Sequence, residues 1–125
     1  MRCVRPTRKK QMITPQTVEN RLGELSNEID TAHEDLVKAE KYYHTSKAVF
    51  EIAIARARIK IGMSNMKLKV GDVADRALLE CELEWNDIQA AEAMVKAARG
   101  NAQRVRTQVD IARSIGTSVR ASMEA

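Results

Sequence analysis

Residues 18–39 read VENRLGELSNEIDTAHEDLVKA, and the apolar or small side chains in this stretch recur at alternating steps of four and three residues. The repeat continues unbroken to Ala57. We call the repeating positions of this first predicted helix the seam: Val18, Leu22, Leu25, Ile29, Ala32, Leu36, Ala39, Tyr43, Ser46, Phe50, Ala53 and Ala57. Such spacing lies along one face of an α-helix and is typical of a coiled coil.

The ends of this helix are marked by local signals. Thr14 is a candidate N-cap, and Pro15 follows at the first helical position, where its missing N–H removes no hydrogen bond. The stretch GMSN at residues 62–65 predicts a break followed by a new helix start. A helix over residues 15–61 would be roughly 70 Å long, which requires a partner helix along its seam.

A second apolar repeat predicts that partner helix, starting near Met66. Its positions are Met66, Val70, Val73, Ala77, Cys81, Trp85, Ile88, Ala91, Val95, Ala98, Ala102, Val105, Val109, Ala112, Gly116, Val119 and Met123. The steps run four-four through Trp85 and then three-three, which predicts a local disturbance of the supercoil. Because the phase continues through Gly100 and Gly116, we expect one long helix with a weak joint at Gly100.

The two helices are predicted to pack as an antiparallel hairpin. Acidic residues 19–40 would lie against basic residues 96–106, and acidic residues 80–92 beside the lysines of residues 38–47, only in the antiparallel arrangement. A turn at 62–65 makes the numbers of facing residues add to about 127. Trp85 should then pack near Tyr42, Tyr43 or Ser46. The predicted fold class is all-α, a long antiparallel helical hairpin that assembles into a helical bundle.

Residues 1–11 are set apart by composition, with five Lys or Arg and no acid. Two interpretations stay open: a disordered basic tail, or an extension upstream of a true start at Met12. We expect residues 12–125 to form a single helical-hairpin domain. The cysteines, Cys3 and Cys81, form no disulfide framework of a secreted domain, and no apolar run approaches membrane-spanning length, so we expect a cytoplasmic protein without a membrane partner.

Composition limits the core. The 125 residues are 44% hydrophobic but only 3% aromatic, with alanine supplying much of the apolar total. A core built from such small side chains is thin, which favours association. A stripe lies off the predicted interface and would be exposed in a lone hairpin: Ile52, Ile59, Leu79, Leu83 and Met94. We expect these residues to mediate oligomerisation, with a homodimer favoured.

Few residues are candidates for chemistry. His33 and His44 are eleven residues apart, about three helical turns, and are too distant to bind one metal. His44 and Cys81 could approach across the hairpin, but a structural zinc site needs four ligands. No Gly-rich phosphate loop, nucleophile elbow or paired catalytic carboxylate is found in the sequence. We therefore expect no enzyme activity, metal, cofactor or small-molecule substrate.

Two basic features are candidates for nucleic-acid binding, and the net charge of +4 permits such a partner. Five cations flank the turn with no acid between Ile52 and Gly71: Arg56, Arg58, Lys60, Lys67 and Lys69. Four arginines recur every seven residues: Arg99, Arg106, Arg113 and Arg120. Arginines in such a line either contact phosphates or form salt bridges with the acidic first helix or another subunit, and both interpretations stay open.

Several motifs carry a resemblance to known proteins. They are Thr14-Pro15 before LSNEI at 25–29, Tyr42-Tyr43, the glycine break, RTQVDIARS at 106–114 and VRASME at 119–124. Over Met12 to Glu124 the chain resembles a group of small helical proteins of tailed bacteriophages. Those proteins are often encoded near recombination and replication genes, and no catalytic residue is carried over from them.

The resemblance implies an accessory role in phage DNA metabolism, in the cytoplasm of the host. We therefore expect a non-enzymatic coiled-coil adaptor that assists DNA replication or recombination through protein contacts and nonspecific DNA contacts. The alternative is a purely structural or host-interaction coiled coil without a nucleic-acid role.

Overall fold

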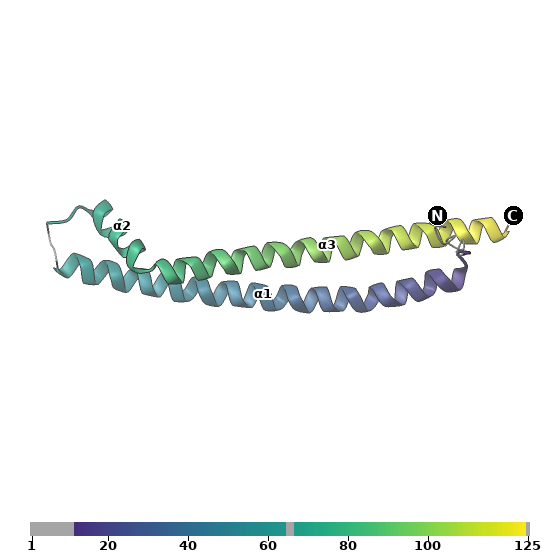
Figure 1. The fold of residues 1–125 in the computed structure, drawn as a ribbon, viewed down its shortest axis with the longest axis horizontal. Coiled ribbons are helices and arrows are strands. Elements are labelled where there is room, and N and C mark those ends of the chain that lie inside the picture. Colours follow the sequence, from purple (N-terminus) through teal and green to yellow (C-terminus); the bar gives the residue numbers. More distant parts are fainter. Residues whose placement is uncertain (1–11, 65–66, 125) are drawn as a thin grey trace, which may run out of the picture. The chain divides into compact units, whose positions relative to one another are not determined.

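A computed structural model describes residues 12–64 and 67–124, which form three helices: α1 (Pro15–Ser64), α2 (Val70–Glu80) and α3 (Glu82–Glu124) (Figure 1). The described part of the chain contains no strand, and α1 packs against α3, which confirms the all-α helical hairpin. The predicted basic tail at 1–11 and the predicted helix start at Met66 lie outside the described residues.

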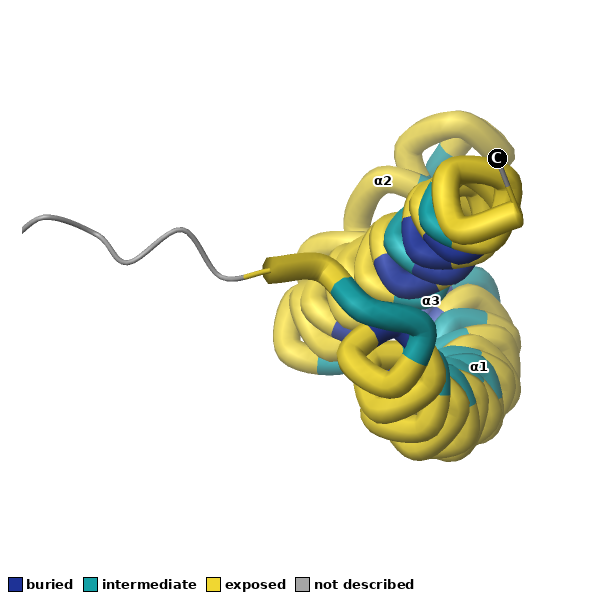
Figure 2. The backbone as a smooth tube through the Cα atoms, turned by 90° about the vertical axis from the view of Figure 1, so that its right-hand side faces the viewer, coloured by how far each residue is buried: buried dark blue, intermediate teal, exposed yellow. Residues whose placement is uncertain are grey.

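Contacts within the chain divide it into two units. We call the described parts of residues 1–30 and 104–125 the terminal unit, and the described parts of residues 31–103 the tip unit. In each unit a segment of α1 pairs with an antiparallel segment of α3. Figure 2 shows that the buried residues gather where these two helices face each other, while the outer surfaces are exposed.

The terminal unit has a core built from both helices. Leu25 and Val105 are almost completely buried, and Val109 and Ala112 complete the cluster with Leu22 and Ile29 against it. The start of α1 is capped at Thr14, as the sequence predicted. The Thr17 N–H donates to Thr14 Oγ1 at 3.2 Å, and the Val18 N–H donates to the Thr14 carbonyl at 3.2 Å.

The tip unit places α2 on the end of α1. Its buried cluster consists of Ala57, Ile61, Ala77 and Cys81, and the half-buried residues against it include Phe50, Leu68 and Val73. Figure 1 shows α2 inclined to α3. The bend is at Cys81, whose N–H is shared between the carbonyls of Ala77 and Leu78, both at 3.1 Å. The irregular spacing in the sequence predicted a local disturbance of the supercoil near this point, but one continuous helix was expected rather than two helices divided at Cys81.

The seam is confirmed, because all of its twelve positions are buried or half-buried. The helix α1 ends at Ser64, within the stretch 62–65 where the sequence predicted a break, and the Ser64 hydroxyl donates to the carbonyl of Lys60. The second helix was predicted to begin at once, but α2 begins only at Val70. The turn is therefore centred near residue 67, and the numbers of facing residues add to about 134 instead of 127. Leu25 with Val109 and Ala57 with Ala77 satisfy the new sum.

The predicted position of Trp85 is also wrong. The buried and half-buried positions that follow Cys81 include Glu84, Ile88, Ala91, Val95 and Ala98, which alternate by three and four. Glu84 thus takes the position expected for Trp85, whose side chain is 41% exposed. The new register places Ser46 opposite Ile88, so Trp85 does not share the packing expected with Ser46 and its tyrosine neighbours. After the bend at Cys81, the buried positions of α3 follow a regular three–four spacing. The Trp85 side chain is not part of this spacing and lies outside the interface with α1.

The helix α3 runs without interruption through both Gly100 and Gly116, as predicted. None of the helices in the described ranges has a stretch that is both long and apolar enough to cross a bilayer.

The two glycines of α3 should respond oppositely to alanine. A Cβ at Gly100 would have no neighbour within 4 Å, whereas a Cβ at Gly116 would lie 2.9 Å from Val18 Cγ1. Gly100→Ala should raise the free energy of unfolding by about 0.5–1 kcal/mol through helix propensity. Gly116→Ala should lower it by about 1 kcal/mol, because the buried β-branched Val18 has little freedom to move.

Urea denaturation of both variants measures this difference. Val18→Ala removes the obstructing methyl groups, so its destabilisation and that of Gly116→Ala should be less than additive in the double variant. Equal stabilisation by both glycine substitutions would contradict the close approach in the terminal unit.

Candidate functional site

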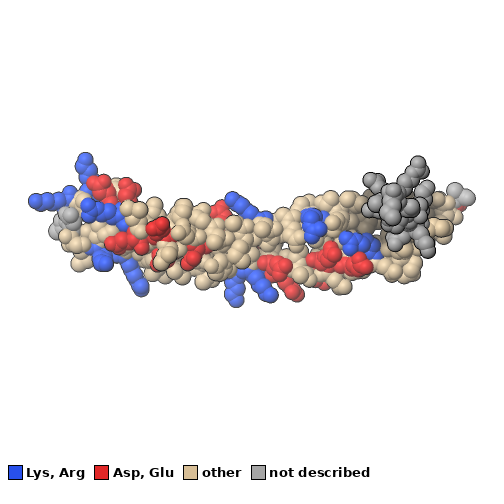
Figure 3. Space-filling model, viewed as in Figure 1, with Lys and Arg blue, Asp and Glu red and all other residues tan. Residues whose placement is uncertain are grey.

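The five predicted cations of the turn lie in the tip unit, and we call Arg56, Arg58, Lys60, Lys67 and Lys69 the basic tip. All five are exposed. Three belong to the last turns of α1, and two lie between α1 and α2. Figure 3 shows Lys and Arg side chains projecting around α2 and the end of α1, with acidic side chains beside them. Asp72 and Asp75 are exposed on α2, so the surroundings of the basic tip are less purely basic than the sequence between Ile52 and Gly71.

The cations of the basic tip do not pair with these acids. No ion pair found among the described residues involves the basic tip. Asp72 instead lies in the first turn of α2, where a carboxylate interacts favourably with the helix dipole. The five positive charges are therefore available to an external anion.

The four heptad-spaced arginines are exposed but differ in their surroundings. Arg99 lies in the tip unit and forms an ion pair with Glu40 of α1 at 3.5 Å. Arg106, Arg113 and Arg120 lie in the terminal unit, where Arg120 Nε donates to the Gly116 carbonyl at 3.4 Å. For Arg99 this geometry favours the salt-bridge interpretation, although both side chains of the pair are largely exposed and the pair contributes little stability.

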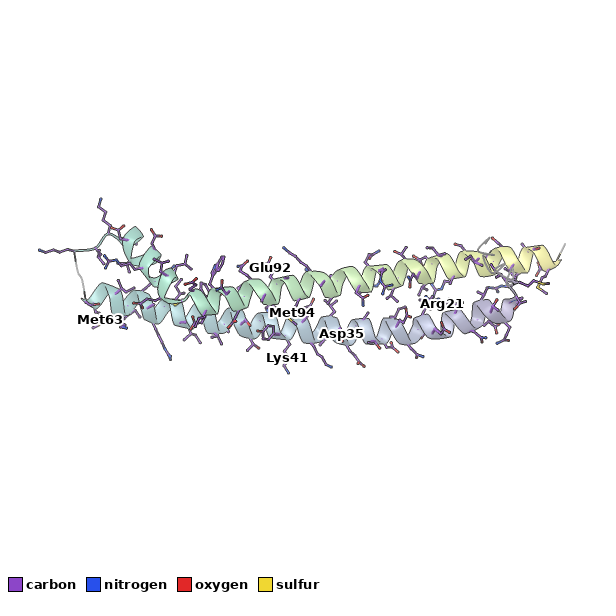
Figure 4. All side chains as sticks on the ribbon, viewed as in Figure 1. Arg21, Asp35, Lys41, Met63, Glu92 and Met94 are labelled. Carbon is purple, nitrogen blue, oxygen red and sulfur yellow. The ribbon has the colours of Figure 1, made fainter. Side chains whose placement is uncertain are left out.

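A depression of about 370 Å³ opens on the charged side of the tip unit. It is lined by Glu40, Tyr43, His44, Glu92, Val95, Lys96 and Arg99. Both carboxylates have cationic partners, since Lys96 Nζ lies 3.4 Å from Glu92 and Arg99 lies 3.5 Å from Glu40. Tyr43 and His44 meet edge to face, with 5.6 Å between ring centroids. Figure 4 shows Glu92 on α3 and Lys41 on the outer side of α1.

Sequence reasoning did not bring this group together. A signal existed in the seam, because Glu40 follows Ala39 and Arg99 follows Ala98, so both flank the interface on the same side. To recognise the pair, one must know which residues of α1 face which residues of α3. The register predicted from the sequence differs from the observed one by seven residues. The two carboxylates that line the depression are thus both in ion pairs with surface cations.

The metal hypothesis for His44 and Cys81 receives no geometric support. Cys81 is in the buried cluster and faces Ala53 in the new register, nine residues along α1 from His44, about 13 Å. No group of three or more His, Cys, Asp or Glu side chains in the described ranges is arranged to hold a metal ion.

The predicted oligomerisation stripe is exposed in the tip unit. Ile52, Ile59, Leu79, Leu83 and Met94 are each more than half exposed. Met94 lies on α3 on the side towards the viewer in Figure 4. The stripe is therefore not covered by a third element among the described residues.

Comparison of the chain with known protein families, characterised proteins and solved structures finds no match. The function must therefore be argued from the site.

The buried thiol at the bend should be unreactive. Burial raises the pKa of Cys81, and the carboxylates of Glu84 and Glu80 raise this pKa further. In a Cys3→Ser background, a thiol-reactive disulfide reagent at pH 8 should label Cys81 at least about tenfold more slowly in buffer than in urea. Glu84→Gln should lower the pKa and increase the labelling rate at pH 8 in buffer. Equal rates in buffer and urea would contradict the burial of Cys81 at this bend.

Proposed function

We propose that the chain is a non-enzymatic coiled-coil accessory protein whose basic tip contacts the phosphate backbone of DNA. The observation that supports this proposal is a set of five exposed cations at one end of a folded helical unit, none of which forms an ion pair with another described residue. Three of these cations lie on the part of α1 that contributes Ala57 and Ile61 to the buried cluster of the tip unit, so packing fixes the position of their backbone.

The chemistry of the basic tip limits the kind of binding. Lysine and arginine contacts to phosphates contribute affinity without reading the base sequence. The basic tip contains no aromatic side chain on which a base could stack, and Phe50 is half-buried against the tip core. Binding should therefore be weak, independent of sequence and similar in kind for single and double strands.

We further propose that this contact serves phage DNA replication or recombination. The resemblance to small helical phage proteins is the basis for this step. In such a role the helical surfaces would bind a protein partner, and the basic tip would hold the assembly near DNA.

A specific observation favours the alternative, a purely structural or host-interaction coiled coil, for other cations of the chain. Arg99 pairs with Glu40, and Arg21 pairs with Glu24 at 3.0 Å and Glu28 at 3.7 Å. These arginines form ion pairs within the protein and are less available to an external phosphate. The DNA proposal therefore rests on the basic tip alone.

A salt titration of fluorescence anisotropy tests the proposal, using the chain that begins at Met12 and labelled oligonucleotides. Each duplex phosphate neutralised should contribute about 0.9 to the slope of log K against log salt. Lys60→Glu with Lys67→Glu should lower the affinity for DNA. The slope should become shallower by the contribution of about two phosphate contacts.

The matched control is Lys38→Glu with Lys41→Glu, which makes the same charge change at exposed lysines of α1 in the same unit. A general effect of net charge would weaken binding equally in both double variants and would refute a specific tip. Absence of binding at low salt would leave the structural alternative.

A further inference from the structure

The last turns of α1 are apolar on two opposite sides. The front side is the seam, which packs against α2 and α3. The opposite side, which we call the back face, consists of Ala48, Ile52, Ala55, Ile59, Gly62 and Met63. At about 100° per residue these side chains fall within an arc of about 140° that contains no charge. A helix with two apolar sides normally has partners on both.

The back face is open in the folded chain. Ile52 is 55% exposed, Ile59 63% and Met63 78%, and both alanines are exposed. Figure 4 marks Met63 at the end of α1. A Cβ at Gly62 would meet nothing within 4 Å, unlike one at Gly116. The small residue at 62 is therefore not required by packing within the hairpin.

Small residues form a line along this face at intervals of seven, at Ala48, Ala55 and Gly62. The distance between packed helices decreases with the size of the side chains between them. A helix that lies on this line can approach closely, with Ile52 and Ile59 packed beside it. The back face therefore has the shape required to pack against another straight helix.

Charges at one edge of the back face identify the partner. Glu51 and Arg58 lie on the same edge, on either side of Ala55, and no ion pair found in the described part of the chain involves either. We propose that a second copy of this chain packs antiparallel on the back face, about a two-fold axis at Ala55. Glu51 of each copy then lies beside Arg58 of the other, so the ion pair forms twice.

The apolar residues fit the same axis. Residues at equal distances from Ala55 face each other, which places Ala48 of one copy against Gly62 of the other. Ile52 and Ile59 are three and four residues from Ala55, so they lie next to each other across the contact. This self-complementarity is what an isologous contact requires. A parallel pairing about a two-fold axis would instead bring Glu51 beside Arg56 of the other copy, and it would leave Arg58 without an acidic partner across the contact.

The other edge of the contact carries an opposing interaction. Arg56 lies close to the axis there, so the two copies bring their Arg56 side chains near each other. Like charges repel, but long exposed side chains can point apart into solvent. Neutralising Arg56 should therefore strengthen the dimer, which distinguishes this axis from others on α1.

Sedimentation equilibrium of the full chain, without nucleic acid, tests the charge pairing. Glu51→Arg and Arg58→Glu should each raise the dimer dissociation constant by about tenfold or more, since two attractive pairs become repulsive. The double variant Glu51→Arg with Arg58→Glu should restore dimerisation, and Arg56→Gln should lower the dissociation constant. Failure of the double variant to restore it would overturn the antiparallel pairing.

A second experiment tests the axis by position. In a Cys3→Ser background, Ala55→Cys should form an intermolecular disulfide rapidly on mild oxidation, whereas Lys41→Cys, elsewhere on α1, should not. Ala55→Glu should abolish the dimer, whereas Leu83→Lys, in the part of the predicted oligomerisation stripe that lies outside the back face, should leave it intact. A monomer at micromolar concentration, or a dimer broken by Leu83→Lys but not by Ala55→Glu, would refute the proposal. The absence of nucleic acid keeps this result independent of the proposed DNA contact.

Discussion

The packing of the seam against α2 and α3 is the constraint on which the rest of the structure depends. A fifty-residue helix in a protein takes most of its stability from packing, and the seam buries little surface where its positions are alanine or serine. Where the side chains of the seam are small, the two helices have to lie close together to bury enough surface. Where α1 and α3 come together in the terminal unit, Gly116 leaves no room for a Cβ beside Val18. The seam therefore fixes both the register and the residues that can occupy it.

Local periodicity was sufficient to predict much of the fold. The 4–3 repeat identified every buried position of α1 up to Ala57 but not Ile61, and the capping signal at Thr14 identified the start of the helix. The position of the turn could not be predicted in this way, because it depends on tertiary packing. Leu68 and Val73 gain burial by packing near Ala57 and Ile61, which favours extending α1 beyond Gly62 and starting α2 later. That displacement of seven residues, together with the bend at Cys81, explains the wrong placement of Trp85.

The candidate sites differed in how far the sequence could reveal them. Exposure of the basic tip followed from its distance from the seam, so no knowledge of pairing was needed. The ion pair between Arg99 and Glu40, and the depression around it, depend on which residues of α1 face α3. An error of one heptad in register preserves the apolar pattern and changes every pair of polar neighbours. Contacts between helices were therefore the part that sequence reasoning missed.

The charges of the chain divide according to their distance from the interface. Arg99 flanks the seam and has an acidic partner across it, whereas the basic tip lies where α1 ends and has none. The same end of α1 also has the uncharged back face, bounded by Arg56 on one edge and Arg58 on the other. On α1, Lys60 lies about 40° beyond Arg56 and therefore outside the back face. Protein association and phosphate contact can therefore occur together at this end of the helix, with Arg56 and Arg58 at the boundary between the two surfaces.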